Sequence, residues 1–112
     1  MDQITAAPNA TLARLEAVIA ERRGGDPQTS YVAKMQGRGL NAIAQKLGEE
    51  AVETIIAALA EDRAALVGEA ADLLFHLMLL LGAKGVPLAE VLAELDRRDG
   101  VSGIAEKASR KL

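Results

Sequence analysis

Apolar and polar residues follow a helical period through most of the chain. The clearest case lies between residues 40 and 60, where seven apolar positions share one face: Leu40, Ile43, Ala44, Leu47, Ala51, Ile55 and Leu59. A second long helix is predicted from Arg63 to Leu81. It is apolar around most of its circumference, so we expect it at the centre of a bundle or at a subunit interface. Only Glu61 and Asp62 separate the two helices, and so short a connection makes them antiparallel neighbours.

Shorter helices are predicted on the N-terminal side of this pair. Thr11 is suited to cap a helix that continues to about Arg23 and stops at the Gly-Gly-Asp-Pro sequence of residues 24–27. One or two helical turns follow from Ser30 to about Gln36, and the glycines at positions 37 and 39 are expected to break them. Residues 1–10 are predicted to form a flexible tail, and residues 11–112 a single domain.

On the C-terminal side, Gly82 and Gly85 are expected to close the second long helix. Pro87 is well placed as the first residue of another helix, which runs to about Arg98. Residues 99–112 are predicted to form a tail that contains two glycines and several basic side chains. Together these elements indicate an all-α fold, a helical bundle built on two long antiparallel helices at about 40–60 and 63–81.

The composition also favours helices over sheets. Half of the 112 residues are apolar, yet there is one Phe, one Tyr and no Trp. Cores made of small aliphatic side chains suit packed helices. A chain of this length fits one domain, and such a chain often completes its core by pairing with a copy of itself.

Charge and cysteine content argue against several classes of protein. A net charge of -3 does not suit general nucleic-acid binding, which needs a basic surface. Without cysteine there is no disulfide, no thiolate metal site and no cysteine nucleophile. The N-terminus has no secretory signal, and the apolar run from Leu73 to Leu81, interrupted by His76, is too short to cross a bilayer. A cytoplasmic protein without a membrane partner is expected.

Two acidic pairs carry the candidate chemistry. The second pair lies in the most apolar stretch of the chain, where an uncompensated charge is costly. Because a helix turns about 100° per residue, each pair falls within one polar stripe of its helix, together with one further polar residue. The first stripe contains Lys46, Glu50 and Glu53, and the second contains Glu69, Asp72 and His76.

These two pairs are predicted to face each other across the hairpin. One lies about as far before the turn as the other lies after it, so at equal rise per residue they reach the same level. Four carboxylates at one level repel strongly, which raises their pKa values or binds a cation. Ligands made only of oxygen favour magnesium, manganese or calcium over zinc. We therefore predict a magnesium site, with manganese as an alternative, at Glu50, Glu53, Glu69 and Asp72.

Simpler interpretations exist for each of these residues. A single acidic pair on a helix is usually a solvated face, whereas two pairs in matching register, one of them on an almost wholly apolar helix, are not typical of one. Glu49 points furthest from the apolar stripe and is the weakest ligand candidate. Lys46 either pairs with Glu50 or contacts phosphate. His76 is either a hydrogen-bonded core residue or a neighbour that supports Asp72.

Several stretches of the chain resemble the phosphoribosyl-ATP pyrophosphatase family. The paired acidic motifs alone resemble the broader MazG-like group of all-α nucleotide pyrophosphohydrolases, and the flanking residues make the resemblance narrower. It covers roughly residues 12–110, and Phe75 stands where we would expect Tyr. The stretches are Ser30-Tyr31, Gly39, Lys46 to Glu53 (Lys-Leu-Gly-Glu-Glu-Ala-Val-Glu), Glu69 to His76 (Glu-Ala-Ala-Asp-Leu-Leu-Phe-His), Glu94 to Arg98 (Glu-Leu-Asp-Arg-Arg) and Ser102 to Arg110 (Ser-Gly-Ile-Ala-Glu-Lys-Ala-Ser-Arg).

The resemblance implies hydrolysis of phosphoribosyl-ATP to phosphoribosyl-AMP and pyrophosphate, the second step of histidine biosynthesis, by a magnesium-dependent cytoplasmic homodimer. At this length the chain would be the form that is not fused to the enzyme of the following step. The candidate catalytic residues are Glu49, Glu50 and Glu53, with Glu49 or Glu50 accepting the proton of the attacking water. Basic side chains either stay solvated or stabilise phosphate charge: Lys46, Arg98, Lys107 and Arg110.

Two rival functions fit the same residues. A MazG-like enzyme that cleaves another nucleoside triphosphate would have the same acidic core. A helical dimerisation or metal-binding module would have the same pattern without catalysis. A di-iron carboxylate bundle expects Glu-x-x-His pairs, and the chain has a single His and no such pair.

Overall fold

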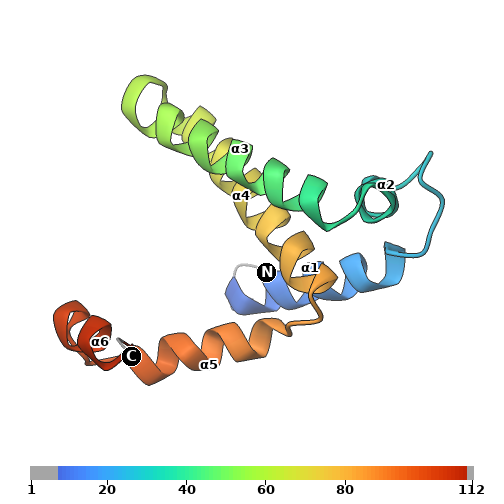
Figure 1. Ribbon diagram of the computed structural model, residues 1–112. Helices are drawn as coiled ribbons and strands as arrows, with labels where there is room; N and C mark the ends of the chain where they lie inside the picture. Colours follow the sequence, from blue (N-terminus) through green and yellow to red (C-terminus); the bar gives the residue numbers. More distant parts are fainter. Residues whose placement is uncertain (1–7, 111–112) are drawn as a thin grey trace, which may run out of the picture.

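The computed structural model describes residues 8–110, and all regular structure in this range is helical, as predicted (Figure 1). The two long helices form an antiparallel hairpin from which the shorter helices extend. In chain order the elements are α1 (Pro8–Arg22), α2 (Tyr31–Arg38), α3 (Leu40–Ala60), α4 (Arg63–Ala83), α5 (Leu88–Arg98) and α6 (Gly103–Arg110).

The hairpin of α3 and α4 is the element that the sequence predicts best. Helix α3 has the predicted bounds, and α4 begins at the predicted residue but continues through Gly82 to Ala83. Asp62 explains the abrupt start of α4, because its side chain accepts a hydrogen bond of 2.9 Å from the backbone nitrogen of Ala65. The two helices run side by side in opposite directions (Figure 1).

A special backbone conformation separates α2 from α3. Ser30 caps α2 by accepting a hydrogen bond from the backbone nitrogen of Ala33, and the helix then runs through Gly37, so the expected break at that glycine is wrong. The helix ends at Gly39, where φ is 97° and ψ is 172°. Only glycine adopts this conformation readily, and it redirects the chain into α3 without a longer loop.

Both ends of the described chain are more helical than predicted. Helix α1 begins at Pro8, so Thr11 lies inside the helix and is not its N-cap. Proline suits a first helical position because it lacks the backbone N–H that would have no partner there. Residues 1–7 lie outside the described range. At the other end, Ser102 accepts a hydrogen bond from the backbone nitrogen of Ala105 and starts α6 in a segment expected to be a tail.

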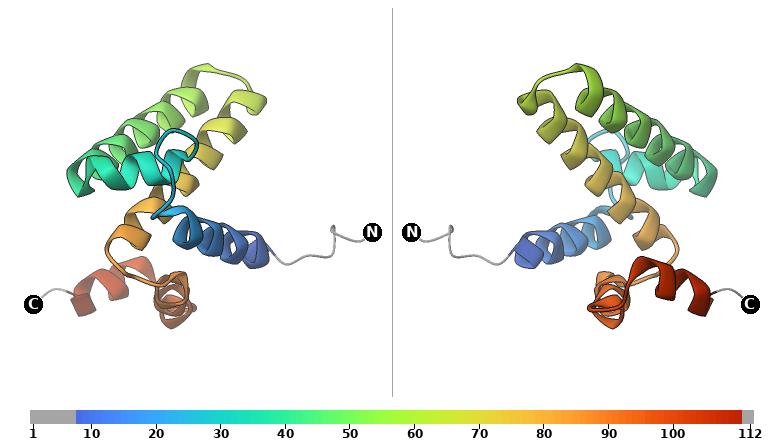
Figure 2. Two further views of the ribbon diagram at one scale, coloured as in Figure 1. Left: turned by 90° about the vertical axis from the view of Figure 1, so that its right-hand side faces the viewer. Right: turned by 90° about the vertical axis from the view of Figure 1, so that its left-hand side faces the viewer.

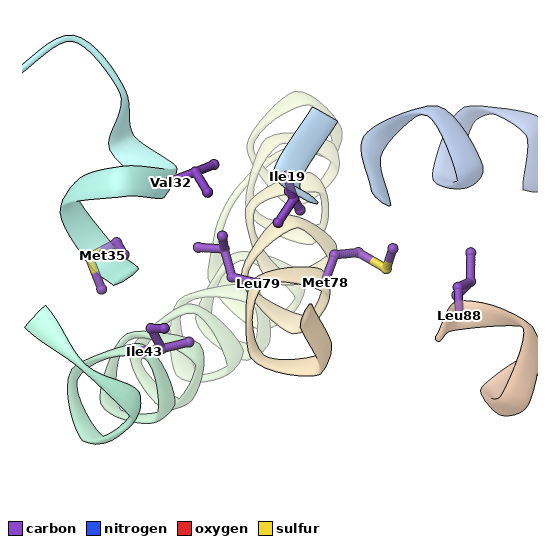
Figure 3. Packing of buried hydrophobic residues seen from close by; sticks show 7 residues of the cluster. All are labelled: Ile19, Val32, Met35, Ile43, Met78, Leu79 and Leu88. Atoms are coloured by element: carbon purple, nitrogen blue, oxygen red, sulfur yellow. The ribbon is translucent and has the colours of Figure 1, made fainter. Parts of the chain in front are cut away.

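The hydrophobic core lies where five helices meet near the open end of the hairpin. Figure 3 shows Met78 extending from α4 toward Leu88, while Leu79 points to the opposite side of the same helix. Helix α5 begins here because its first backbone N–H, at Leu88, donates to the carboxylate of Glu16 on α1 at 2.7 Å. The buried cluster contains Ile19, Val32, Met35, Ile43, Met78, Leu79 and Leu88.

The other end of the hairpin is not covered by any described element. The Cα radius of gyration is 16.3 Å, whereas a compact chain of this length has about 13 Å. Both side views show α3 and α4 extending away from the remaining helices (Figure 2). Of the seven apolar residues predicted to share one face of α3, only Ile43 is buried, and Leu59 is 83% exposed.

Helix α4 is long and apolar enough to cross a membrane by length and composition alone. Its 21 residues include the shorter run, Leu73 to Leu81, on which the prediction against a membrane span was based. The core helix of a soluble protein can have the same length and composition. The apolar sequence of the helix is interrupted by three polar side chains, those of Glu69, Asp72 and His76.

Candidate functional site

Three of the four carboxylates predicted to bind metal converge between α3 and α4. One oxygen from each of Glu50, Glu69 and Asp72 lies within 4.8 Å of the others. Helix α3 supplies the first, and two residues one turn apart on α4 supply the others. The antiparallel register brings them together, since each acidic pair lies at a similar distance from the turn.

Glu50 is the most buried member of this acidic group, with 5% of its surface exposed. One oxygen, Oε2, forms an ion pair of 3.3 Å with Nζ of Lys46. The other, Oε1, is buried and has no hydrogen-bond partner, and the same holds for Oε1 of Glu69. A buried carboxylate oxygen without a partner is costly, so both atoms fit a site that a cation completes.

Glu53, the fourth predicted ligand, lies beside the acidic group rather than in it. Its side chain is exposed and lies close enough to Glu69 to affect the titration of that residue. The pKa of Glu69 is raised, first by burial and then by Glu53, Glu50 and Asp72. A carboxylate whose neighbours are also negative holds its proton more tightly. The electrostatic consequence expected from converging carboxylates is therefore present at Glu69.

Thr54 connects the two helices at the level of the acidic group. Its hydroxyl oxygen lies 2.8 Å from the backbone oxygen of Glu50 and 3.1 Å from that of Glu69. The single hydroxyl proton is shared between these carbonyls, one from each helix. Sequence reasoning missed this residue. Its only sequence signal is a threonine four residues after Glu50, a spacing at which a hydroxyl can bond back to the helix.

His76 lies beside Asp72, as the pattern predicted, and is buried. Its Nδ1 lies 2.7 Å from the backbone oxygen of Asp72, and its Nε2 lies 2.8 Å from the hydroxyl of Tyr31 on α2. A carbonyl can only accept, so Nδ1 donates, and Nε2 of the neutral ring accepts from Tyr31. The contact to Asp72 is thus through the backbone. Phe75 packs its ring against both His76 and Tyr31.

Glu49 and Lys46 lie on the solvent side of the acidic group. Glu49 is exposed, accepts a hydrogen bond of 3.1 Å from Gln45 and lies 3.8 Å from Nζ of Lys46. Lys46 therefore contacts both Glu49 and Glu50, and the hydrogen bond with Glu50 is the main cause of its raised pKa. The predicted pairing with Glu50 is confirmed, and a phosphate contact stays a prediction.

The other basic residues predicted to contact phosphate lie on α5 and α6. Both figures place these helices away from the α3–α4 hairpin (Figures 1 and 2). Arg98 donates to Glu94 at 3.0 Å, and Lys107 and Arg110 are exposed on α6. Arg97 and Arg98 together lower the pKa of Glu94 to about 2. Within one chain these cations are not brought to the acidic group.

An oxygen-only donor set of this kind suits a hard divalent cation. The group offers no sulfur, and the nearest ring nitrogens, those of His76, are both hydrogen-bonded. Such a centre neutralises phosphate charge and positions a phosphoanhydride for attack by water. The geometry therefore supports hydrolysis of a polyphosphate.

Comparison with known proteins gives a consistent result. Residues 12–99 match the model of the phosphoribosyl-ATP pyrophosphohydrolase family. The phosphoribosyl-ATP pyrophosphatase of Novosphingobium aromaticivorans is 75% identical over 99 residues, which are 88% of this chain and 92% of the relative. Those of Rhizorhabdus wittichii and Erythrobacter litoralis are 67% and 61% identical over 100 residues, 89% of this chain and 94% and 96% of theirs. The chain belongs to the phosphoribosyl-ATP pyrophosphohydrolase family.

Proposed function

We propose that this protein hydrolyses phosphoribosyl-ATP to phosphoribosyl-AMP and pyrophosphate, the second step of histidine biosynthesis, and that it does so with magnesium. Family membership supports the substrate and the reaction. Manganese would suit the same oxygen ligands. The reaction consumes water at the linkage between the α- and β-phosphates and needs no covalent intermediate on the protein.

The observation that carries the proposal is the pair of buried carboxylate oxygens without partners. Oε1 of Glu50 and Oε1 of Glu69 belong to side chains that converge with Asp72. These atoms accept no hydrogen bond within the described part of the fold, so the free-energy cost of burying them would be offset when a cation binds. We assign Glu50, Glu69 and Asp72 as ligands, with Glu53 as the neighbouring fourth carboxylate.

Magnesium, when bound, would neutralise the triphosphate and favour in-line attack by water at the α–β linkage. The proton of that water needs an acceptor. Glu50 is buried and paired with Lys46, whereas Glu49 is exposed on the adjacent solvent side. Glu49 is therefore the more accessible of the two predicted bases. Glu53 disfavours the ionised form of Glu69, and a cation bound beside them would offset this repulsion.

The test is pyrophosphate release by the purified protein with magnesium, comparing phosphoribosyl-ATP with ATP and a panel of other triphosphates. We expect rapid release from phosphoribosyl-ATP alone and none in the presence of a chelator. Release from another triphosphate would support the acidic site but not this substrate. Release from none would leave a non-catalytic helical module as the better interpretation.

A pair of variants separates the site from the fold. Glu53→Gln should retain the helical circular dichroism spectrum but reduce turnover by about 100-fold or more, the scale expected when one electrostatic element of an active site is lost. Glu90→Gln, an exposed acidic residue on α5, is the control and should leave turnover unchanged. Normal turnover in Glu53→Gln would remove that residue from the site.

The protein is also proposed to act as a homodimer in the cytoplasm, without a membrane partner. Support for the dimer comes from the exposed apolar side chains of the hairpin, which are Val52, Ile55, Ile56 and Leu59 on α3 and Val67, Leu74 and Leu77 on α4. An apolar surface of this extent is typical of an interface. In a dimer, the basic residues of α5 and α6 of one chain could approach the acidic group of the other chain.

A further inference from the structure

A polar cavity of about 210 Å³ lies between α2 and the first half of α3. Its walls come from two helices whose directions are set by Gly39, at the junction between them. Helix α2 contributes Tyr31, Lys34, Met35 and Arg38, and α3 contributes Ala42, Gln45, Lys46 and Glu49.

The charge around this cavity is mainly positive. Three of its lining side chains are cationic and one is anionic. Lys34 and Arg38 lie one helical turn apart on α2, and neither forms an ion pair with another side chain in the described part of the chain. Isolated cationic side chains on a surface are commonly solvated and do not indicate a binding site. Two of them on the rim of a polar hollow, facing a third from another helix, form a site suited to an anion.

Two contacts join this cavity to the acidic group. Lys46 lines the cavity and is paired with Glu50 at 3.3 Å. Tyr31 lines it as well, and its hydroxyl bonds to His76, which bonds to the backbone of Asp72. A ligand could therefore span both places at once, with one anionic group in the cavity and another on a cation held by the acidic group.

We infer that Lys34 and Arg38, with Lys46, bind a terminal phosphate of the substrate. The choice of ligand rests on the proposed function. Phosphoribosyl-ATP has two such ends, the 5′-phosphate of the phosphoribosyl group and the γ-phosphate of the triphosphate. Arg38 offers a planar fork of donors to phosphate oxygens, and Lys34 and Lys46 add point charges. Because Tyr31 donates its proton to His76, recognition of the phosphate depends on the cations.

A binding experiment tests this site without relying on turnover. Tyr31 is the sole tyrosine of a chain without tryptophan, so tyrosine fluorescence comes from one residue of the cavity wall. Ribose 5-phosphate and pyrophosphate are the probes, titrated separately without magnesium. We expect a saturable change with at least one of them, and affinity lower by about ten- to a hundredfold in Lys34→Gln and in Arg38→Gln, the effect of losing one charge-assisted hydrogen bond.

The control variant is Arg22→Gln, an exposed arginine in the last turn of α1 that does not line the cavity. It should bind both probes with unchanged affinity. The absence of a saturable signal with either probe, or equal affinities in all variants, would overturn the proposal. If Arg22→Gln lost as much affinity as the other variants, binding would depend on the overall positive charge of the chain and not on this cavity, and the proposal would also be overturned.

Kinetics then identify which phosphate is bound. In Arg38→Gln the KM for phosphoribosyl-ATP should rise by about tenfold or more with a smaller change in kcat. ATP lacks the phosphoribosyl group but has the triphosphate. Its inhibition constant, compared between the wild type and Arg38→Gln, therefore shows which of the two phosphates the cavity binds. An unchanged constant for ATP assigns the cavity to the phosphoribosyl 5′-phosphate, and an equal loss assigns it to the γ-phosphate. If neither KM nor the inhibition constant changes, the cavity takes no part in substrate binding.

Discussion

The hydroxyl group of Tyr31 lies 2.8 Å from Nε2 of His76 and joins α2 to α4 across 45 positions of the sequence. The bond has a defined direction, because the other ring nitrogen of His76 donates to the backbone of Asp72. Burial of the phenol raises the pKa of Tyr31, so the hydroxyl keeps its proton and remains a donor. The short helix α2, which carries two cations of the polar cavity, is thereby fixed to the helix that carries the acidic residues.

Tyr31→Phe should destabilise the protein by about 1–3 kcal/mol, since it leaves the buried Nε2 of His76 without a donor. The ring of residue 31 can keep its contact with Phe75. Urea denaturation measures the change. A double-mutant cycle with His76→Leu should show that the two substitutions cost less together than the sum of their separate effects. Additive costs would mean that the hydrogen bond contributes nothing to stability.

Two glycines close together in the chain should respond to alanine in opposite ways. Gly39 has φ 97°, a conformation that alanine adopts only with strain, although no atom lies within 4 Å of the added Cβ. Gly39→Ala should therefore cost about 1–3 kcal/mol through the backbone alone. Gly37 is helical and equally open. Gly37→Ala should stabilise by about 0.5–1 kcal/mol, and thermal denaturation of both variants should show shifts of opposite sign.

Glu69→Gln should make the metal-free protein more stable at neutral pH while it removes activity. The raised pKa of Glu69 means that the folded state holds the proton more tightly than the unfolded state. Its contribution to the free energy of unfolding is therefore greatest below the ordinary pKa of 4.5 and is lost as the pH rises through the folded-state value. The uncharged glutamine avoids this loss.

The measurement is urea denaturation of the wild type and Glu69→Gln from acidic to neutral pH in a chelator. The difference in stability between them should grow in favour of the variant as the pH rises. Added magnesium should stabilise the wild type and have less effect on the variant, because one ligand is missing. A difference that is constant with pH would show that Glu69 titrates in the same way in the folded and unfolded chains.

Long helices with simple endings could be predicted from the sequence. The bounds of α3 are as predicted, because its apolar period begins directly after Gly39 and ends where Asp62 can cap the next helix. The start of α1 and the existence of α6 were missed. Both depend on weak local signals, a proline at a first helical position and a serine cap in a short segment rich in glycine.

For the candidate site, the pattern was enough to place polar residues on facing stripes. It did not predict the difference between Glu50, which is buried with the acidic group, and Glu53, which lies exposed beside it. The roles of Thr54 and Tyr31 were also missed. Thr54 acts through backbone oxygens of both helices, and Tyr31 reaches His76 from a distant helix. Contacts of this kind depend on tertiary packing, which periodicity does not encode.

The exposed apolar face of the hairpin leads to a prediction about assembly. If a second copy covers this face, the mass in solution should be a multiple of the 11.7 kDa of one chain, with a dimer expected. Leu74→Glu places a charge on the apolar face of α4 and should weaken association by about 100-fold or more, because burying an unpaired carboxylate is costly. Leu74 is 47% exposed in the single chain, so the variant can still fold.

Light scattering after size exclusion measures the mass, and Ala13→Glu on the exposed side of α1 is the matched control. Circular dichroism of the separated Leu74→Glu chain should remain helical, since Leu74 is not one of the residues of the buried core cluster. Its turnover distinguishes two arrangements of the site. A monomer that still hydrolyses phosphoribosyl-ATP would have a complete site within one chain. A folded but inactive monomer would mean that the partner supplies essential residues. The basic side chains of Lys107 and Arg110 on α6 are candidates, because they could bind substrate phosphates in the partner's site.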